Sequence, residues 1–272
     1  MSRFLNNTGL LRTLADNSFK AIDEGYYNAE MYNLDSHSTF SLRNYILACS
    51  GFPIICEIKF SSPSRGTILE YNQIDLVNLA GRLAESGIVG LSVVTQPFMF
   101  KGSIHYLARV RKTVTVPILM KDIIVSEIQI DAAKRIGADC ILLIKTLFDQ
   151  GLAEGTLDRF IDYAENKGLH VLIEVHKDCE YREVLTSPNK RHLIGINNRN
   201  LDSLDVNLDV TRTLLRKYEK GKNIIISESG ISSSDQIKEL SSLGVDGFLI
   251  GTSIMESEDP ISKVREWCNR VD

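Results

Sequence analysis

Short apolar runs alternate with longer amphipathic stretches from residue 54 to the end of the chain. Eight runs rich in Ile, Val and Leu lie at 54–60, 91–95, 118–122, 140–145, 171–175, 193–198, 224–229 and 247–251. The spacing between their starts matches one strand, one helix and two turns. Because strands that are apolar on both faces belong to parallel sheets covered by helices, the pattern predicts repeated βαβ units.

The stretches between the runs carry residues typical of helix ends. Ser126 precedes apolar residues at helical spacing and Gly137 follows them, and Ser234 and Gly244 stand in the same relation further along. A Ser at the N-cap and a Gly just past the last turn fit a helix. Eight such units favour an α/β fold of the closed (β/α)8 TIM barrel type over an open doubly wound sheet, which usually has fewer strands.

The first 50 residues precede this repeat. Apolar residues recur in them, from Leu10 to Ile22 and again from Leu42 to Leu47, and predict helices that pack on the barrel. We therefore expect an N-terminal helical extension at 1–50 that caps the barrel and a (β/α)8 barrel at 51–272. The two form a single domain overall.

Composition and charge exclude several classes of protein. The 272 residues are 43% hydrophobic with a formal net charge of −4, which excludes a disordered chain and a basic nucleic-acid binder. No apolar run approaches the roughly 18 residues of a membrane span. The five cysteines form no C-x-x-C pair, and the N-terminus lacks the apolar core of a signal peptide. We expect reduced thiols and a cytoplasmic protein.

Polar and ionisable residues stand at the ends of five predicted strands. They are Glu57, Lys59, Lys121, Glu174, Asn197 and Ser229. The C-terminal ends of barrel strands form the active site in this fold. For any single Lys or Glu of this set, the alternative to a catalytic role is a salt-bridge network that only fills the barrel. For the whole set we favour acid–base chemistry, because barrel interiors are normally layered with Val, Ile and Leu.

The two lysines and the parity of the first strand add detail. Glu57 and Lys59 are two residues apart and share the inward face, while Cys56 lies on the helix-facing side. Neighbouring ammonium groups and burial both lower the pKa of a lysine. We therefore expect one lysine of lowered pKa to act as a proton donor.

Loops of small residues predict a phosphate site. Ser229 and Gly230 follow the seventh run, Gly251 and Thr252 follow the eighth, and a serine-rich loop that includes Ser62 follows the first. The loops after strands seven and eight of barrels often bind phosphate through backbone N–H groups. With the positive charge of Arg199, they favour a phosphorylated small-molecule substrate.

Two further features concern ligands. The aromatic stretch 98–100 follows the second run, and Phe100 suits either the core, a lid or the wall of an aromatic substrate pocket. The five histidines show no metal-binding spacing, so we expect no metal.

The chain resembles the indole-3-glycerol phosphate synthase family over roughly residues 50–255. The matching segments are PIICEIK at 53–59 with SPS at 62–64, GLSVVT at 90–95 with FKGS at 100–103, PILMKD at 117–122, ADCILLI at 138–144, LIEV at 172–175, IGINNR at 194–199, SESGI at 227–231 and FLIG at 248–251. The resemblance implies a (β/α)8 barrel whose N-terminal extension lies over the active site.

The resemblance also implies a reaction. The family closes the ring of 1-(2-carboxyphenylamino)-1-deoxyribulose 5-phosphate to form indole-3-glycerol phosphate with loss of CO₂ and water, and it uses no cofactor and no metal. It implies neither nucleic-acid nor membrane partners. We expect a monomer, and weak association with other tryptophan-pathway enzymes stays open.

The matching positions imply roles for individual residues. Lys121 is similar to the general acid of ring closure and Glu174 to the acid–base of dehydration. Lys59 is expected to hold the substrate carboxylate or to act as a second acid, and Glu57 to orient the lysines. The remaining implied contacts are substrate hydroxyls for Asn197 and Ser229, added positive charge for Arg199, the phosphate for Ser62, Ser229, Gly230, Gly251 and Thr252, and the aryl pocket for Phe100, Leu142 and Leu204.

Two alternatives remain. Phosphoribosylanthranilate isomerase, another phosphosugar barrel, uses a Cys base and an Asp acid, whereas Cys56 is expected to point outward here. A catalytically silent phosphate-binding barrel would be expected to lose its ionisable strand ends, which this chain keeps.

Overall fold

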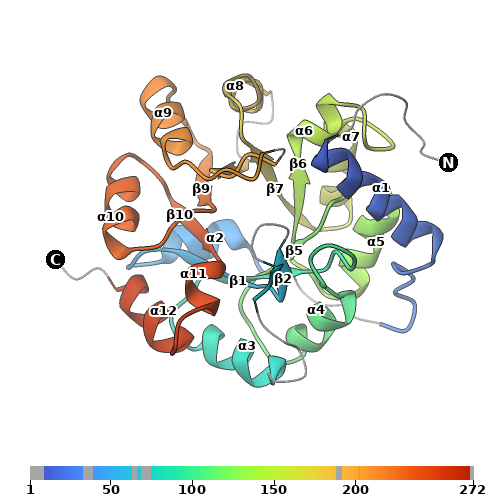
Figure 1. Ribbon diagram of the computed structural model, residues 1–272, viewed down its shortest axis with the longest axis horizontal. Helices are drawn as coiled ribbons and strands as arrows, with labels where there is room; N and C mark the ends of the chain where they lie inside the picture. The colour runs from blue at the N-terminus through green and yellow to red at the C-terminus, as the bar shows by residue number, and fades with distance from the viewer. Residues whose placement is uncertain are drawn as a thin grey trace.

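A closed parallel barrel forms the centre of the protein (Figure 1). The computed structural model describes residues 9–32, 39–62, 66–68, 75–187, 192–201 and 203–269. Within these ranges the eight barrel strands are β1 (Ile54–Ile58), β4 (Gly90–Val94), β5 (Ile118–Lys121), β6 (Cys140–Ile144), β7 (His170–Val175), β8 (Leu193–Asn197), β9 (Ile224–Glu228) and β10 (Gly247–Ile250). Each pairs with its neighbours in chain order, and β10 pairs with β1. The predicted (β/α)8 fold is confirmed.

Helices surround the barrel, and a short hairpin follows the first strand. The helices are α3 (Leu76–Ala84), α4 (Ile104–Arg111), α5 (Glu127–Arg135), α6 (Lys145–Asp149), α7 (Leu157–Asn166), α8 (Asp178–Thr186), α9 (Asp209–Lys217), α10 (Ser234–Ser242), α11 (Thr252–Met255) and α12 (Pro260–Cys268). The hairpin consists of β2 (Ser61–Ser62) and β3 (Gly66–Thr67). No helix of the described ranges has the length and apolarity that crossing a membrane requires.

The predicted helix ends are right for α5 and one residue off for α10. Ser126 is the N-cap of α5 and forms a capping box with Gln129. The N-cap of α10 is Ser233, whose extended backbone lets its side chain accept a hydrogen bond from the Gln236 N–H. Ser234, the predicted cap, is therefore already inside the helix. Gly137 and Gly244 follow the helices with positive φ, as expected of C-terminal glycines.

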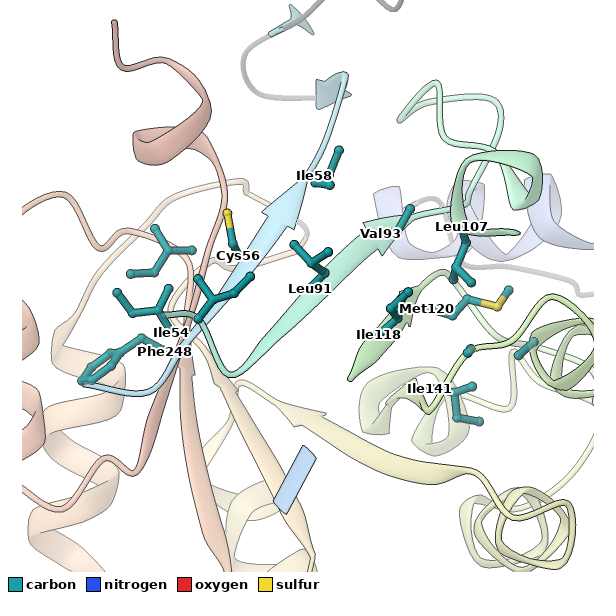
Figure 2. Packing of buried hydrophobic residues seen from close by; sticks show 14 of the residues in the cluster. Ile54, Cys56, Ile58, Leu91, Val93, Leu107, Ile118, Met120, Ile141 and Phe248 are labelled. Atoms are coloured by element: carbon teal, nitrogen blue, oxygen red, sulfur yellow. The ribbon is translucent and has the colours of Figure 1, made fainter. Parts of the chain in front are cut away.

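Side chains of the strands alternate between two apolar layers. On β1, Ile55 faces the barrel interior together with Leu119, Leu142 and Leu172. Ile54, Cys56 and Ile58 face the helices, where they pack with Leu91, Val93 and Phe248 (Figure 2). The parity prediction for β1 is therefore confirmed, and Glu57 and Lys59 continue the inward face. Full burial of each such aliphatic side chain contributes about 1.5–3 kcal/mol.

The N-terminal extension reaches both ends of the barrel. Helix α1 (Leu10–Asp23) lies beside α5 and α6 (Figure 1), and Leu14 and Phe19 join the inner apolar layer. Helix α2 (Leu42–Ala48) lies at the opposite end, where Leu42 and Ile46 contact the starts of β4 and β10. The prediction of a cap over the active site thus describes α1, whereas α2 closes the N-terminal end. The domain boundary at residue 50 stays a prediction.

A buried ion pair ties the extension to this N-terminal end. Asp139 accepts hydrogen bonds from Arg111 Nη1 at 2.8 Å, from the Ile118 N–H at 2.8 Å and from the Phe40 N–H at 2.7 Å. The extension, α4 and the start of β5 therefore meet at one carboxylate just before β6.

Candidate active site

A cavity of about 500 Å³ opens at the C-terminal ends of the barrel strands. Its wall combines inward strand residues, the following loops and α1. The lining residues include Leu10, Leu14, Glu57, Lys59, Phe100, Lys121, Leu142, Glu174, Asn197, Arg199, Leu204, Glu228, Ser229, Gly230, Gly251 and Thr252. All the predicted site residues except Ser62 therefore line one cavity. The predicted phosphate contact of Ser62 lies outside what the structure describes.

Lys121 lies at the centre of the polar part of the cavity. Its Nζ donates to Glu174 Oε2 at 2.9 Å and to Glu228 Oε2 at 3.1 Å. The other oxygen of Glu174 accepts a hydrogen bond from Asn197 Nδ2 at 2.9 Å. The Asn197 Oδ1 in turn accepts the Arg199 N–H at 2.9 Å. Strands β5, β7, β8 and β9 thus deliver one connected network.

A second ion pair lies on β1. Lys59 Nζ is 2.6 Å from Glu57 Oε1, and the Glu57 carboxylate is buried. Gly251 makes room for it, because a Cβ at that position would lie 2.8 Å from Glu57 Oε1. One function of Gly251 is therefore to admit the Glu57 side chain, in addition to the phosphate contact that the sequence predicts.

The carboxylates decide the protonation of this cluster. Burial alone would lower the pKa of Lys121, but Glu174, Glu228 and Glu57 outweigh it and raise the pKa above its ordinary value. The prediction of a lowered lysine pKa is thus wrong for Lys121, because the surrounding carboxyl groups stabilise its positive charge. Burial would likewise raise the pKa of Glu57, yet Lys59 and Lys121 lower it.

Glu228 is a site residue that sequence reasoning missed. Burial raises its pKa to about 8, opposed by Lys121 and reinforced by Glu174. Its Oε1 has no hydrogen-bond partner among the described residues, and a Cβ at Gly195 would overlap that oxygen. Parity could have identified it, since Glu228 is two residues past the inward Ile226. The sequence prediction instead selected the next residue, Ser229, as the end of this strand.

The loops after β9 and β10 form a compact end of the cavity. Ser229 and Gly230 both have positive φ, so the chain turns sharply after Glu228. Asn198, another residue that the prediction overlooked, fixes this turn. Its Nδ2 donates to the Ser227 hydroxyl and to the carbonyls of Glu228 and Ser229. Its place next to the predicted Asn197, in an Asn–Asn pair at the strand end, was the sequence feature that could have indicated it.

Small residues and one cation shape the space beyond this turn. Gly251 is the N-cap of α11, and Ser253 Oγ of that helix donates to the Ile231 carbonyl at 2.7 Å. Arg199 Nη1 donates to the Leu204 carbonyl at 2.9 Å, which holds the guanidinium at the cavity wall. Backbone N–H groups next to Gly can approach an anion closely.

The opposite wall of the cavity is apolar. Phe100 comes from the loop after β4 and Leu142 from β6, as predicted. Leu10 and Leu14 of α1 and Ile123 after β5 complete this wall. The contribution of α1 was expected only as a general cover over the site. The surface suits a flat aromatic group, which buries its faces against aliphatic side chains.

Metal ligation has little support. Across the described ranges, no group of three or more His, Cys, Asp or Glu side chains is arranged to hold a metal ion. His176 Nδ1 lies 2.8 Å from the carbonyl of Asn197, outside the Lys121 network. The arrangement can instead donate and accept protons around one ammonium group, next to an apolar wall and a small-residue anion site.

Comparison with known proteins shows the family of the chain. The family model for indole-3-glycerol phosphate synthase matches residues 20–267. A protein of that name from Aquifex aeolicus is 41% identical over 221 residues, covering 81% of this chain and 82% of its own. A second, from Methanocaldococcus jannaschii, is 42% identical over 215 residues, with 79% and 77% covered.

Among solved structures, the barrel is similar to thiamine phosphate pyrophosphorylase from Pyrococcus furiosus. The TM-score is 0.57 at 15% sequence identity, and the match covers 84% of this chain and 96% of that one. At this identity the likeness concerns the fold alone.

Proposed function

The chain belongs to the indole-3-glycerol phosphate synthase family, carboxy-lyases of tryptophan biosynthesis, and we propose that it catalyses the family reaction with the residues of the cavity described above. The substrate is 1-(2-carboxyphenylamino)-1-deoxyribulose 5-phosphate. The products are indole-3-glycerol phosphate, CO₂ and water. The observation that carries the proposal is the convergence of Lys121, Glu174 and Glu228 within hydrogen-bond distance on one wall of the cavity.

The two ends of the substrate match the two ends of the cavity. We place the phosphate at the loops after β9 and β10, near Gly230 and Thr252. The aryl ring then lies against Phe100 and Leu142, and its carboxylate meets the Lys59 ammonium. This orientation brings the ketone of the ribulose chain between the two ends, where Lys121 lies.

Ring closure requires a positive group at the ketone oxygen. The aryl carbon that carries the carboxylate attacks C2, a carbon–carbon bond forms and the carbonyl electrons move to oxygen. The Lys121 ammonium stabilises this charge and transfers a proton to it. Its raised pKa keeps it protonated before the reaction, and an alkoxide is more basic than an amine, so the transfer remains favourable. Lys59, near the carboxylate, is the candidate for a second acid.

Decarboxylation and dehydration complete the sequence. The bond from the ring to the carboxylate breaks, CO₂ leaves and its electron pair restores the aromatic ring. The C2 hydroxyl then leaves as water with a proton from an acid, and a base removes a proton from the neighbouring carbon. We assign this step to Glu174, which forms hydrogen bonds with Asn197 and Lys121. Burial raises the pKa of Glu228, next to Lys121, to about 8, which makes it a second candidate for proton transfer in this step.

A direct turnover assay tests the proposal. The purified full-length chain is mixed with the substrate, and formation of the indole product is followed by fluorescence. We expect turnover in the wild type and a loss of kcat of about 10²-fold or more in Lys121→Ala, because a positioned acid contributes this much. Exposed Lys238→Ala on α10 is the matched control.

Other results would contradict it. Robust turnover of phosphoribosylanthranilate in place of this substrate would support the isomerase alternative, although Cys56 is buried in the helix-facing layer. Binding of the product without turnover at any pH would support a silent barrel.

A further inference from the structure

A buried carboxylate lies directly after Lys121, on the opposite side of the chain. Asp122 continues the outward face of β5 and is 2% exposed. Tyr27 OH donates to its two oxygens at 3.1 and 3.0 Å, the Thr95 hydroxyl donates to Oδ2, and the Ile123 N–H donates to Oδ1 at 2.7 Å. Within the described part of the chain, these donors to Asp122 are all neutral.

The neighbouring tyrosine ties the same segment to the second strand of the site. Tyr26 OH donates to the Thr95 carbonyl at 2.8 Å and accepts the Ile104 N–H at the start of α4 at 3.0 Å. Six residues before Tyr26, the Lys20 ammonium of α1 lies 4.7 Å from the centre of the Phe98 ring, in the loop that also carries Phe100. The segment after α1 therefore contacts the ends of both β4 and β5.

We propose that Asp122 is a positioning residue for Lys121. Hydrogen bonds from Tyr27 and Thr95 hold Asp122, and Asp122 fixes the end of β5. The N-terminal extension, which carries Tyr27, therefore helps to position the Lys121 ammonium group. The inference rests on the proposed function, since it presupposes that Lys121 is the acid.

The energetic cost of burying Asp122 argues that this carboxylate does more than attach the N-terminal extension to the barrel. A buried charge without an ionic partner is costly, and apolar side chains would attach the extension more cheaply. Hydrogen bonds from three directions, however, restrain the position of Asp122 far more narrowly than apolar contact does. Misplacement of a reacting group by about 1 Å can cost about 10²-fold in rate. The function of these hydrogen bonds is therefore to keep Lys121 at a constant position relative to the ketone of the substrate.

The protonation of Asp122 gives the network a measurable property. Burial raises its pKa to about 6, opposed by hydrogen bonds from Thr95, Ile123 and Tyr27. The titratable groups that face it are Tyr26 and Tyr27, and burial together with Asp122 raises the pKa of both. The two tyrosines therefore remain neutral donors. Lys121 lies on the other face of the strand, and neutral Gln129 of α5 also contacts Tyr27.

Single-hydroxyl variants test the proposal. Tyr27→Phe and Thr95→Val each remove one donor, and we expect kcat to fall by about 10- to 100-fold with KM within about twofold. Thr95→Ser keeps the hydroxyl and should restore most of the activity. Tyr45→Phe is the matched control, because Tyr45 OH of the same extension donates to Thr115 at the other end of the barrel. Its kcat should be that of the wild type.

The pH profile separates positioning from a general loss of stability. Wild-type kcat should fall below about pH 6 as Asp122 takes up a proton, and Asp122→Asn should lack this acidic limb while keeping a uniformly low kcat. Wild-type kcat in Tyr27→Phe and Asp122→Asn would overturn the proposal. So would a loss that Tyr45→Phe shares.

Amide hydrogen exchange makes the test independent of the substrate. In Tyr27→Phe, exchange of the peptide 118–126 should rise by about tenfold relative to wild type, with peptides from α2 unchanged. An unchanged 118–126 peptide would refute the network even if no turnover is detected. Absence of wild-type turnover with the expected exchange result would instead refute only the proposed function.

Discussion

Replacing Glu228 by Gln exchanges a buried carboxyl group for a neutral amide of nearly the same shape. Burial raises the pKa of Glu228 from 4.5 to about 8. Below pH 4.5 the group is protonated in both the native and the unfolded chain, so it contributes no difference. Between pH 4.5 and about pH 8, Glu228 releases its proton in the unfolded chain and keeps it in the native protein. The contribution of Glu228 to the free energy of unfolding of the wild type therefore falls by about 1.4 kcal/mol per pH unit in this window.

Glu228→Gln carries no titratable group at this position, so its free energy of unfolding does not show this fall with pH. From about pH 5 to about pH 8 the difference in unfolding free energy, Gln minus Glu, should grow by roughly 3–4 kcal/mol. Lys121 stays protonated over this range because its pKa is raised. Asp122, His170 and His192 titrate with shifted pKa values in both proteins, and their contributions cancel in the difference.

Urea unfolding followed by circular dichroism measures the difference. Both proteins are unfolded at several pH values from about 5 to about 9, and midpoints are compared at equal slope. Exposed Glu258→Gln on the loop before α12 controls for the loss of a surface carboxylate. A difference that stays constant with pH, or that shrinks as the pH rises, would mean that native Glu228 is ionised throughout. The raised pKa of Glu228 would then be wrong.

Three further perturbations follow from the same geometry. Gly195→Ala places a Cβ against Glu228 Oε1. We expect it to lower the free energy of unfolding by about 1–3 kcal/mol, measured by urea unfolding, and to lower kcat, measured by product fluorescence. An unchanged kcat would refute the tight fit between Gly195 and Glu228. Lys59→Met should raise KM by about tenfold and raise the pKa of Glu57, whose titration by carbon-13 NMR reports the lost partner; an unmoved titration would contradict the pairing. Asp139→Ala should destabilise the protein by about 3–5 kcal/mol through the unpaired Arg111 yet leave kcat intact at permissive temperature, because the pair lies at the other end of the barrel.

Much of the site could be predicted because barrel geometry turns sequence position into spatial position. The ends of parallel strands meet at one rim, so Lys121, Glu174 and Asn197 had to converge once the strands were identified. Glu228 escaped because the last residue of β9 and the first residue of the turn are both polar. Only the positive φ of Ser229 shows where the strand ends.

The protonation of the cluster could not be predicted in the same way. Counting lysines in the sequence predicted a lowered pKa, whereas the balance of charges around Lys121 depends on which carboxylates lie within a few ångströms. Three carboxyl groups, those of Glu174, Glu228 and Glu57, lie near that ammonium, and their attraction outweighs the cost of burial.

The sequence by itself determined the fold and most of the rim residues, since the period of apolar runs and the parity within a strand are local properties of the chain. The tertiary structure alone decided which groups share protons, which glycines admit the side chains of Glu57 and Glu228, and how the extension divides between the two ends of the barrel. These depend on distances between segments as far apart as Tyr27 and Asp122. No local pattern encodes such distances, because they result from packing the whole chain around one core.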